Sequence, residues 1–193
     1  MMLGALPEVA LRDLQDEDLA ARADRDLNAF AELYDRYLCR IYRFVRSQTR
    51  DDPTAEDLTA QTFFKALAGA RSFRGQGSYR SWIFRIARNT IATWRARHSK
   101  GPIVLAQVPE AADPGPSPSA AAVADEEQRI VRLLVNTLPP AQREVLWLRY
   151  LDELTTDEVA RVTGRTQGAV RTLLHRAIAS LRRALNDRGL GAG

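Results

Sequence analysis

The residues best suited to read nucleic-acid bases lie between positions 167 and 176. Glutamine can pair bidentately with adenine and arginine with guanine, and a glycine lets the backbone approach a base closely. The candidates for base contacts are Gln167, Gly168, Arg171, Thr172, His175 and Arg176. Their spacing places them on the first turns of one helix, where such contacts are usually made.

A second group of candidates combines aromatic and basic side chains between positions 73 and 94. Aromatic rings stack on unpaired bases while arginines follow the phosphates, which is how proteins hold single strands. The aromatic members are Phe73, Tyr79, Trp82, Phe84 and Trp94. Packing in the core is an equally good interpretation of Trp82, Phe84 and Trp94, and both interpretations stay open.

The sequence contains few of the residues that catalysis or metal binding requires. One cysteine and two histidines are too few for a disulfide framework, a cysteine metal cluster or most histidine catalysis. One acidic cluster has ligands of the kind that Mg²⁺ prefers, but its spacing suits a helix start, where acids interact favourably with the dipole. Its members are Asp51, Asp52, Glu56 and Asp57. We therefore expect no catalytic residue, no bound metal and no cofactor.

Charge is distributed unevenly along the 193 residues. Residues 8–35 contain nine acids and three bases, whereas residues 58–101 and 159–186 contain no acid. Two basic segments behind an acidic front indicate a polyanion contacted at two places, and two solvated helix faces are the alternative. We also hypothesise that the acidic N-terminal stretch shields the basic helices in the free protein.

No run approaches the ~18 apolar residues of a membrane span, and the acidic N-terminus does not resemble a secretory signal. We expect a cytoplasmic protein without a membrane span.

Apolar periodicity predicts helices throughout and no strand. In the front half, Phe30, Leu33, Tyr37, Ile41 and Phe44 recur on one helical face. A break at 51–53 precedes a second helix, and a loop with two glycines precedes a third, which we expect Ser81 to cap and which runs to about Arg97.

The rear half has the local signals of a helix-turn-helix. Helices are expected over 126–138 and 141–151. Thr155 and Glu158 then have the spacing of a capping box, Gly164 suits a helix end, and Thr166 can cap a final helix that runs to about Leu185. This order, a short helix followed by a tight turn and a longer basic helix, is typical of a helix-turn-helix. That motif places its second helix in the major groove.

Between the halves, residues 101–125 hold five of the nine prolines and no base. This composition predicts a flexible Pro/Ala-rich linker. The expected fold is all-α, with two small helical domains of which the second is a helix-turn-helix. The expected divisions are an acidic tail over 1–25, domains over 26–100 and 126–188, the linker over 101–125, and a short tail over 189–193.

Three segments resemble a bacterial RNA polymerase sigma factor of the extracytoplasmic-function class with regions two and four only. TAEDLTAQTFFKAL resembles the polymerase-docking helix of region two. SFRGQGSYRSWIFRIARNTIATWRAR resembles the segment that melts and holds the promoter element near the start site. In region four, LPPAQREVLWLRYLDELTTDEVARVTGRTQGAVRTLLHRAIASLRRAL resembles the helix-turn-helix that reads the farther element.

The resemblance implies a role for each group of residues. Polymerase would be contacted by Asp57, Leu58, Gln61 and Phe64. The opened promoter strand would be held by Phe73, Tyr79, Arg80, Trp82, Arg85, Arg88 and Asn89, with Asn89 at a flipped base. The candidates between 167 and 176 would face the farther element. Core RNA polymerase, promoter DNA and an anti-sigma factor are the implied partners, and the implied activity is promoter-specific initiation without catalysis by this chain.

The sequence departs from the family pattern at several positions: Ala60 and Gln61 stand in place of Gln-Glu, Thr93 in place of Asp, and Leu173 and Ile178 in place of Arg. Two alternatives stay open. A stand-alone helix-turn-helix regulator explains the rear half but not the aromatic and basic helix of the front half. A sigma-like polymerase adaptor that no longer melts DNA fits the departures.

Overall fold

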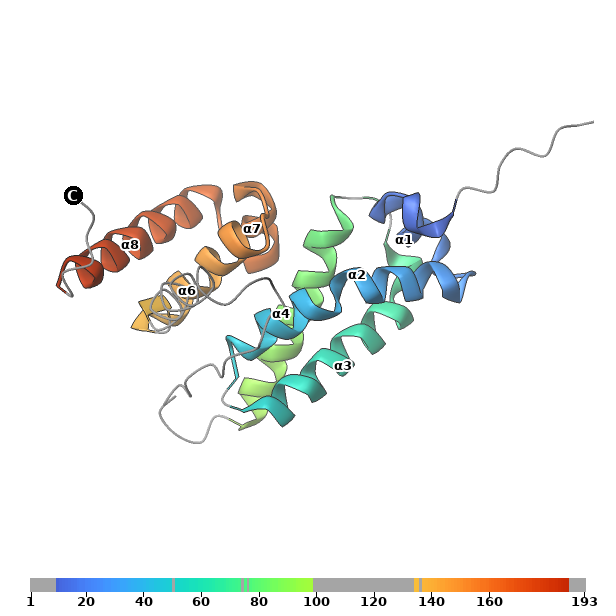
Figure 1. The fold of residues 1–193 in the computed structure, drawn as a ribbon, viewed down its shortest axis with the longest axis horizontal. Helices are drawn as coiled ribbons and strands as arrows, with labels where there is room; N and C mark the ends of the chain where they lie inside the picture. The colour runs from blue at the N-terminus through green and yellow to red at the C-terminus, as the bar shows by residue number, and fades with distance from the viewer. Residues whose placement is uncertain are drawn as a thin grey trace, which may run out of the picture.

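The fold is entirely helical in the part of the chain that the structure describes. This computed structural model describes residues 10–49, 51–73, 75, 77–98, 134–135 and 137–187. Figure 1 shows an N-terminal group of helices, α1 to α4, beside a C-terminal group, α6 to α8. The predicted all-α fold is confirmed, while the predicted linker lies outside the described residues. Among the described helices, none has the length and apolar character to cross a membrane.

The N-terminal group contains four α-helices and two short 3-10 turns. The α-helices are α1 (Asp16–Arg22), α2 (Leu27–Arg46), α3 (Asp52–Ala68) and α4 (Tyr79–His98), and the turns are η1 (Leu11–Asp13) and η2 (Ala70–Ser72). The predicted apolar face of α2 is confirmed, because Leu33, Tyr37, Ile41 and Phe44 are buried and Phe30 is partly buried against the core.

Side-chain caps determine where these helices begin. The carboxylate of Asp51 accepts a hydrogen bond of 2.8 Å from the Thr54 N–H, and Pro53 follows in the first turn of α3. The Ser78 hydroxyl accepts from the Ser81 N–H at 3.2 Å. The prediction that Ser81 caps this helix was therefore wrong, since α4 begins at Tyr79 and Ser81 is buried in its first turn.

The acidic N-terminal stretch packs on the domain that follows it. Leu19 of α1 is fully buried. Arg36 of α2 donates to the Leu14 carbonyl and to the Asp16 carboxylate, both at 2.9 Å. The segment predicted as an acidic tail, residues 1–25, thus contains the helix α1 among its described residues. With only seven residues, α1 depends on tertiary packing for its stability.

From Pro140 onward, the described residues of the C-terminal group contain three α-helices and a π-helical turn. They are α6 (Pro140–Leu146), the π-helical turn η3 (Trp147–Leu151), α7 (Thr156–Thr163) and α8 (Gln167–Asn186). The helix predicted over 126–138 lies largely outside the described residues. The helix predicted over 141–151 is present, but its last turn is π-helical.

The two groups pack against each other. α7 packs along α4, and the buried apolar side chains of both groups belong to one continuous cluster. Arg143 of α6 is 2% exposed and reaches the Ser47 carbonyl at the end of α2. The described halves of the chain therefore form one closed body.

Candidate nucleic-acid interface

The helix-turn-helix of α7 and α8 is set by local capping. The Thr155 hydroxyl accepts from the Glu158 N–H at 3.2 Å, while the Glu158 carboxylate accepts from the Thr155 N–H at 2.8 Å. Gly164 ends α7 in the left-handed region, at φ 65°. Thr166 then caps α8 by accepting from the Ala169 N–H. Each of these predicted signals is confirmed.

The start of α8 presents its polar side chains to solvent. The six candidates for base contacts are all exposed, while Val170, Leu174 and Ala177 on the opposite face are buried. A Cβ at Gly168 would meet nothing within 4 Å. An exposed, basic helix start held by a packed supporting helix is the geometry of a major-groove reader.

Hydrogen bonds across the turn orient the first two candidate side chains. The Gln167 amide donates to the Asp157 carboxylate at 3.0 Å, and Arg171 donates to the Gln167 amide oxygen at 3.3 Å. Asp157 also pairs with Arg161 at 2.9 Å. Asp157 was not among the predicted site residues. An acid in the first turn of a helix is usually explained by its favourable interaction with the helix dipole, so the sequence did not indicate a second role.

The second candidate surface lies on α4, where the predicted residues differ in exposure. Arg85 and Asn89 are exposed. Arg80 and Arg88 are partly buried, because each faces a carboxylate of the C-terminal group. Arg85, Arg88 and Asn89 share one side of α4, whereas the helical period places Arg80 opposite Asn89. Carboxylates of the C-terminal group face Arg80 and Arg88.

The aromatic residues of this segment form a packed cluster. Ring centroids of Phe73, Tyr79 and Trp82 lie 5.5–5.7 Å apart. Phe73 and Trp82 are partly exposed. Tyr79 is 2% exposed and Phe84 is fully buried, so both belong to the core in this state. The structure places Tyr79 beneath the surface on which a base would stack, because its first-turn position on α4 turns the ring toward Tyr37.

The predicted polymerase-facing residues of α3 also separate into two classes. Asp57, Gln61 and Phe64 are exposed, and Phe64 is 74% exposed despite its size. Leu58 is 1% exposed and packs in the core. Leu58 therefore supports this face from beneath, because its place in the helical period turns it toward α2 and α4 rather than outward.

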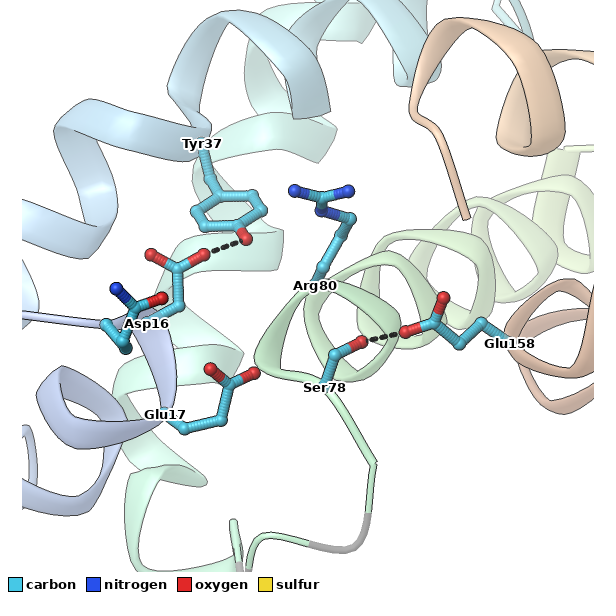
Figure 2. A pocket seen from close by; sticks show the side chains of 7 residues that line it. Asp16, Glu17, Tyr37, Ser78, Arg80 and Glu158 are labelled. Atoms are coloured by element: carbon cyan, nitrogen blue, oxygen red, sulfur yellow. Dashed lines mark hydrogen bonds between the residues drawn. The ribbon is translucent and has the colours of Figure 1, made fainter. Parts of the chain in front are cut away.

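A polar pocket lies where α1, α4 and α7 meet, and sequence reasoning did not predict it. Figure 2 shows Asp16 and Glu17 on one side, Glu158 on the other and Arg80 between them. Asp16 accepts from the Tyr37 hydroxyl, and Glu158 accepts from the Ser78 hydroxyl. Burial alone would raise the pKa of Glu158, but the hydrogen bonds from Ser78 and Thr155 lower it.

The carboxylate of Asp152 is buried in the contact between the two groups. Its side chain is 4% exposed, and Arg40 of α2 approaches it at 3.4 Å. Burial raises the pKa of Asp152 to about 7, although the nearby guanidinium groups of Arg40, Arg43 and Arg80 act to lower it. Nothing in the local sequence indicated this residue, because its environment comes from helices over 100 positions away.

Family models match both halves of the chain. The model described as sigma-70 region 2 matches residues 33–101, and the model described as sigma-70 region 4 matches residues 128–181. The first covers most of α2 and all of α3 and α4, and the second covers α6, α7 and most of α8. Their order matches the order expected from the sequence.

Curated relatives agree with these models. The ECF RNA polymerase sigma factor BldN of Streptomyces coelicolor is 33% identical over 173 residues, which are 88% of this chain and 66% of BldN. The RNA polymerase sigma factor YlaC of Bacillus subtilis is 30% identical over 158 residues, which are 81% of this chain and 91% of YlaC. The match thus spans about two thirds of one relative and nearly all of the other.

A solved structure has the same fold. The sigma factor RpoE of Bartonella quintana, in complex with the anti-sigma factor NepR, superposes with a TM-score of 0.67 at 22% identity, over 81% of this chain and 96% of that chain. The two regions match in this order, the second contains the helix-turn-helix, and the chain is 30% identical to YlaC. The chain therefore belongs to the RNA polymerase sigma factors, in the extracytoplasmic-function class that carries regions 2 and 4.

Proposed function

We propose that this sigma factor binds core RNA polymerase and directs it to specific promoters, with region two holding the opened −10 element and region four reading the −35 element. The observation that carries the proposal is the pair of exposed polar helix faces, on α4 and α8, in a chain whose two halves match regions 2 and 4. The domains we assign are residues 26–100 and 126–188.

In region four, base readout is assigned to the exposed start of α8. Arg171 can bind guanine bidentately and Gln167 can bind adenine. The other contacts come from Gly168, Thr172, His175 and Arg176. The hydrogen bonds that Gln167 donates to Asp157 and that Arg171 donates to Gln167 support this assignment, since they restrict the two side chains before DNA binds.

In region two, the opened strand is assigned to α4 and the loop before it. Arg80, Arg85 and Arg88 follow the phosphates, and Asn89 contacts an unpaired base. Phe73 and Trp82 supply stacking surface, and Tyr79 supports them from the core. Stacking is worth about 1–3 kcal/mol per base, which is enough to offset the few kcal/mol that unpairing costs.

Polymerase docking is assigned to the exposed face of α3, with Phe64 as its apolar centre, Asp57 and Gln61 beside it and Leu58 holding the helix in place. We propose that the chain acts in the cytoplasm, where polymerase and promoters are, and that it contributes no catalytic residue, metal or cofactor of its own. An anti-sigma factor is a further proposed partner, by analogy with RpoE, which is bound by NepR.

The test is run-off transcription with bacterial core polymerase on fragments of the source genome, with and without the protein. We expect discrete transcripts that depend on the protein, and the sequences upstream of their starts identify both elements. Co-elution with core polymerase without transcripts would favour an adaptor. The absence of both transcripts and co-elution would refute the proposal.

One pair of variants tests the role of α8. Arg171→Ala is expected to cost about 1–3 kcal/mol at the correct promoter and to relax specificity at one −35 position. Arg183→Ala removes the same charge from the last turn of α8, away from the bases, and is expected to weaken binding equally for all sequences. Equal loss of specificity in both variants would contradict base readout by Arg171.

A further inference from the structure

Helix α1 is fastened to region two at a defined position. Arg36 of α2 donates hydrogen bonds to the Arg12 carbonyl at 2.7 Å and to the Asp16 carboxylate at 2.9 Å. Asp16 also accepts from the hydroxyl of Tyr37, the next residue of α2. Leu19 of α1 is fully buried in the core. Because polar and apolar contacts both hold it, α1 can support the elements that it contacts.

Two further contacts of α1 and its C-terminal end lie on either side of the segment that carries the proposed stacking surface. Glu17 accepts from the Tyr79 N–H at 3.1 Å, at the first residue of α4. Asp24, just after α1, lies 3.8 Å from Arg71 in η2. A carboxylate beside the first N–H groups of a helix is favoured by the helix dipole, whereas an ion pair with a side chain as exposed as Arg71 contributes little. Glu17 therefore makes the stronger of the two contacts.

The residue whose amide Glu17 holds lies at the centre of the aromatic cluster. Phe73, which follows η2, packs on Trp82 of α4 with ring centroids 5.6 Å apart. The Tyr79 ring contacts both, at 5.7 Å from Phe73 and 5.5 Å from Trp82. A shift at the start of α4 would therefore move both of the partly exposed rings.

We propose that Glu17 is a positioning residue for the opened promoter strand: through the start of α4 and Tyr79, it fixes the surface that Phe73 and Trp82 present to an unpaired base. This role rests on the proposed function of region two, and Glu17 acts through Tyr79 rather than on the strand. A surface that is ordered in advance loses less conformational entropy when a base binds. The role also differs from general shielding by the acidic stretch, because it depends on one carboxylate at one amide and not on net charge.

The variants compare two acids of the same helical turn. Glu17→Ala removes the acceptor of the Tyr79 N–H. Asp18→Ala makes the same change of charge one residue later, where the side chain is exposed and has no ion pair or side-chain hydrogen bond within the described residues. Glu17→Gln keeps an oxygen that can accept from the Tyr79 N–H but carries no charge, so it tests rescue by a conservative change.

The first test needs neither DNA nor polymerase. Hydrogen exchange is measured by NMR on the full chain at the Ser81 and Trp82 amides, whose hydrogen bonds lie in the first turn of α4. We expect exchange about fivefold faster in Glu17→Ala, as for the loss of one capping interaction, and native rates in Asp18→Ala. The Leu174 amide of α8 is expected to keep its rate, because the effect is local. Native rates in Glu17→Ala, equal acceleration in Asp18→Ala, or equal acceleration at Leu174 would refute the proposal.

The second test measures the strand, with holoenzyme formed from core polymerase and each variant. The probe is the non-template −10 strand of a promoter mapped by run-off transcription, with 2-aminopurine at the unpaired base, whose fluorescence is quenched by stacking. We expect Glu17→Ala to bind the probe about fivefold more weakly, with less quenching at saturation. Glu17→Gln is expected to bind within about twofold of the native protein, and Asp18→Ala no more weakly than the native protein. Affinity for a −35 duplex is expected to be unchanged in all variants, since region four is untouched.

Native affinity and full quenching in Glu17→Ala would overturn the proposal. So would tighter binding by Glu17→Ala and Asp18→Ala alike, which is the result that shielding predicts. Failure of the proposed function gives a different result, because the native chain itself then yields no transcripts. Hydrogen exchange decides in either case whether Glu17 holds the start of α4.

Discussion

The burial of Asp152 makes the stability of this protein depend on pH. Its Oδ2 atom is buried without a hydrogen-bond partner, and the contact of its Oδ1 atom with Arg40 is long, at 3.4 Å. The cost of burying the charge therefore exceeds the gain from the nearby arginines, and the pKa is raised from 3.8 to about 7. The folded protein thus holds a proton that the unfolded chain releases.

The direction of the effect follows from this difference. Where the folded state binds more protons than the unfolded state, the free energy of unfolding falls as the pH rises. For one group shifted from 3.8 to about 7, the loss between about pH 5 and pH 8 is about 2.5 kcal/mol. Well below pH 3.8 both states are protonated and the cost disappears, and well above pH 7 both are ionised and the cost is complete.

The perturbation is Asp152→Asn, which keeps the size of the side chain and removes its titration. Urea unfolding followed by circular dichroism at several pH values is the assay. We expect the free energy of unfolding of the native protein to fall by about 2.5 kcal/mol between about pH 5 and pH 8, and that of the variant to stay nearly level. A native protein whose stability is level or rising, or a variant with the native slope, would refute the reasoning.

Three further predictions concern the core, the cap and the docking face. Leu33→Ala empties a fully buried site in α2 and is expected to lower the free energy of unfolding by about 2–5 kcal/mol in urea; a loss below about 1 kcal/mol would contradict its core position. Thr155→Ala removes half of the capping box and is expected to cost about 1 kcal/mol, whereas Thr156→Ala, one residue later, leaves the box intact and serves as its control. Phe64→Gln is expected to change stability by less than about 0.5 kcal/mol, because the side chain is exposed, but to weaken co-elution with core polymerase; undiminished co-elution would remove Phe64 from the docking face.

The local elements of this protein were predictable from the sequence because their causes lie within a few residues. The capping box of Thr155 and Glu158, the end of α7 at Gly164 and the cap of α8 at Thr166 each depend on neighbours three to five positions away. The apolar period of α2 likewise identified the face that turns inward. The exposed start of α8 followed from these local signals, and the family resemblance followed from motifs that lie within single helices.

Tertiary structure decided which surfaces are free, because that depends on partners far away in the sequence. The helical period places Leu58 on the inner face of α3, but the exposure of Phe64 depends on the positions of α2 and α4. The burial of Tyr79 likewise depends on Tyr37 from another helix. The pairing of Arg88 with Glu144 joins residues 56 positions apart, on opposite sides of the predicted linker. Charge and helical period are local properties of the chain, whereas burial and pairing are set only when the two regions pack together.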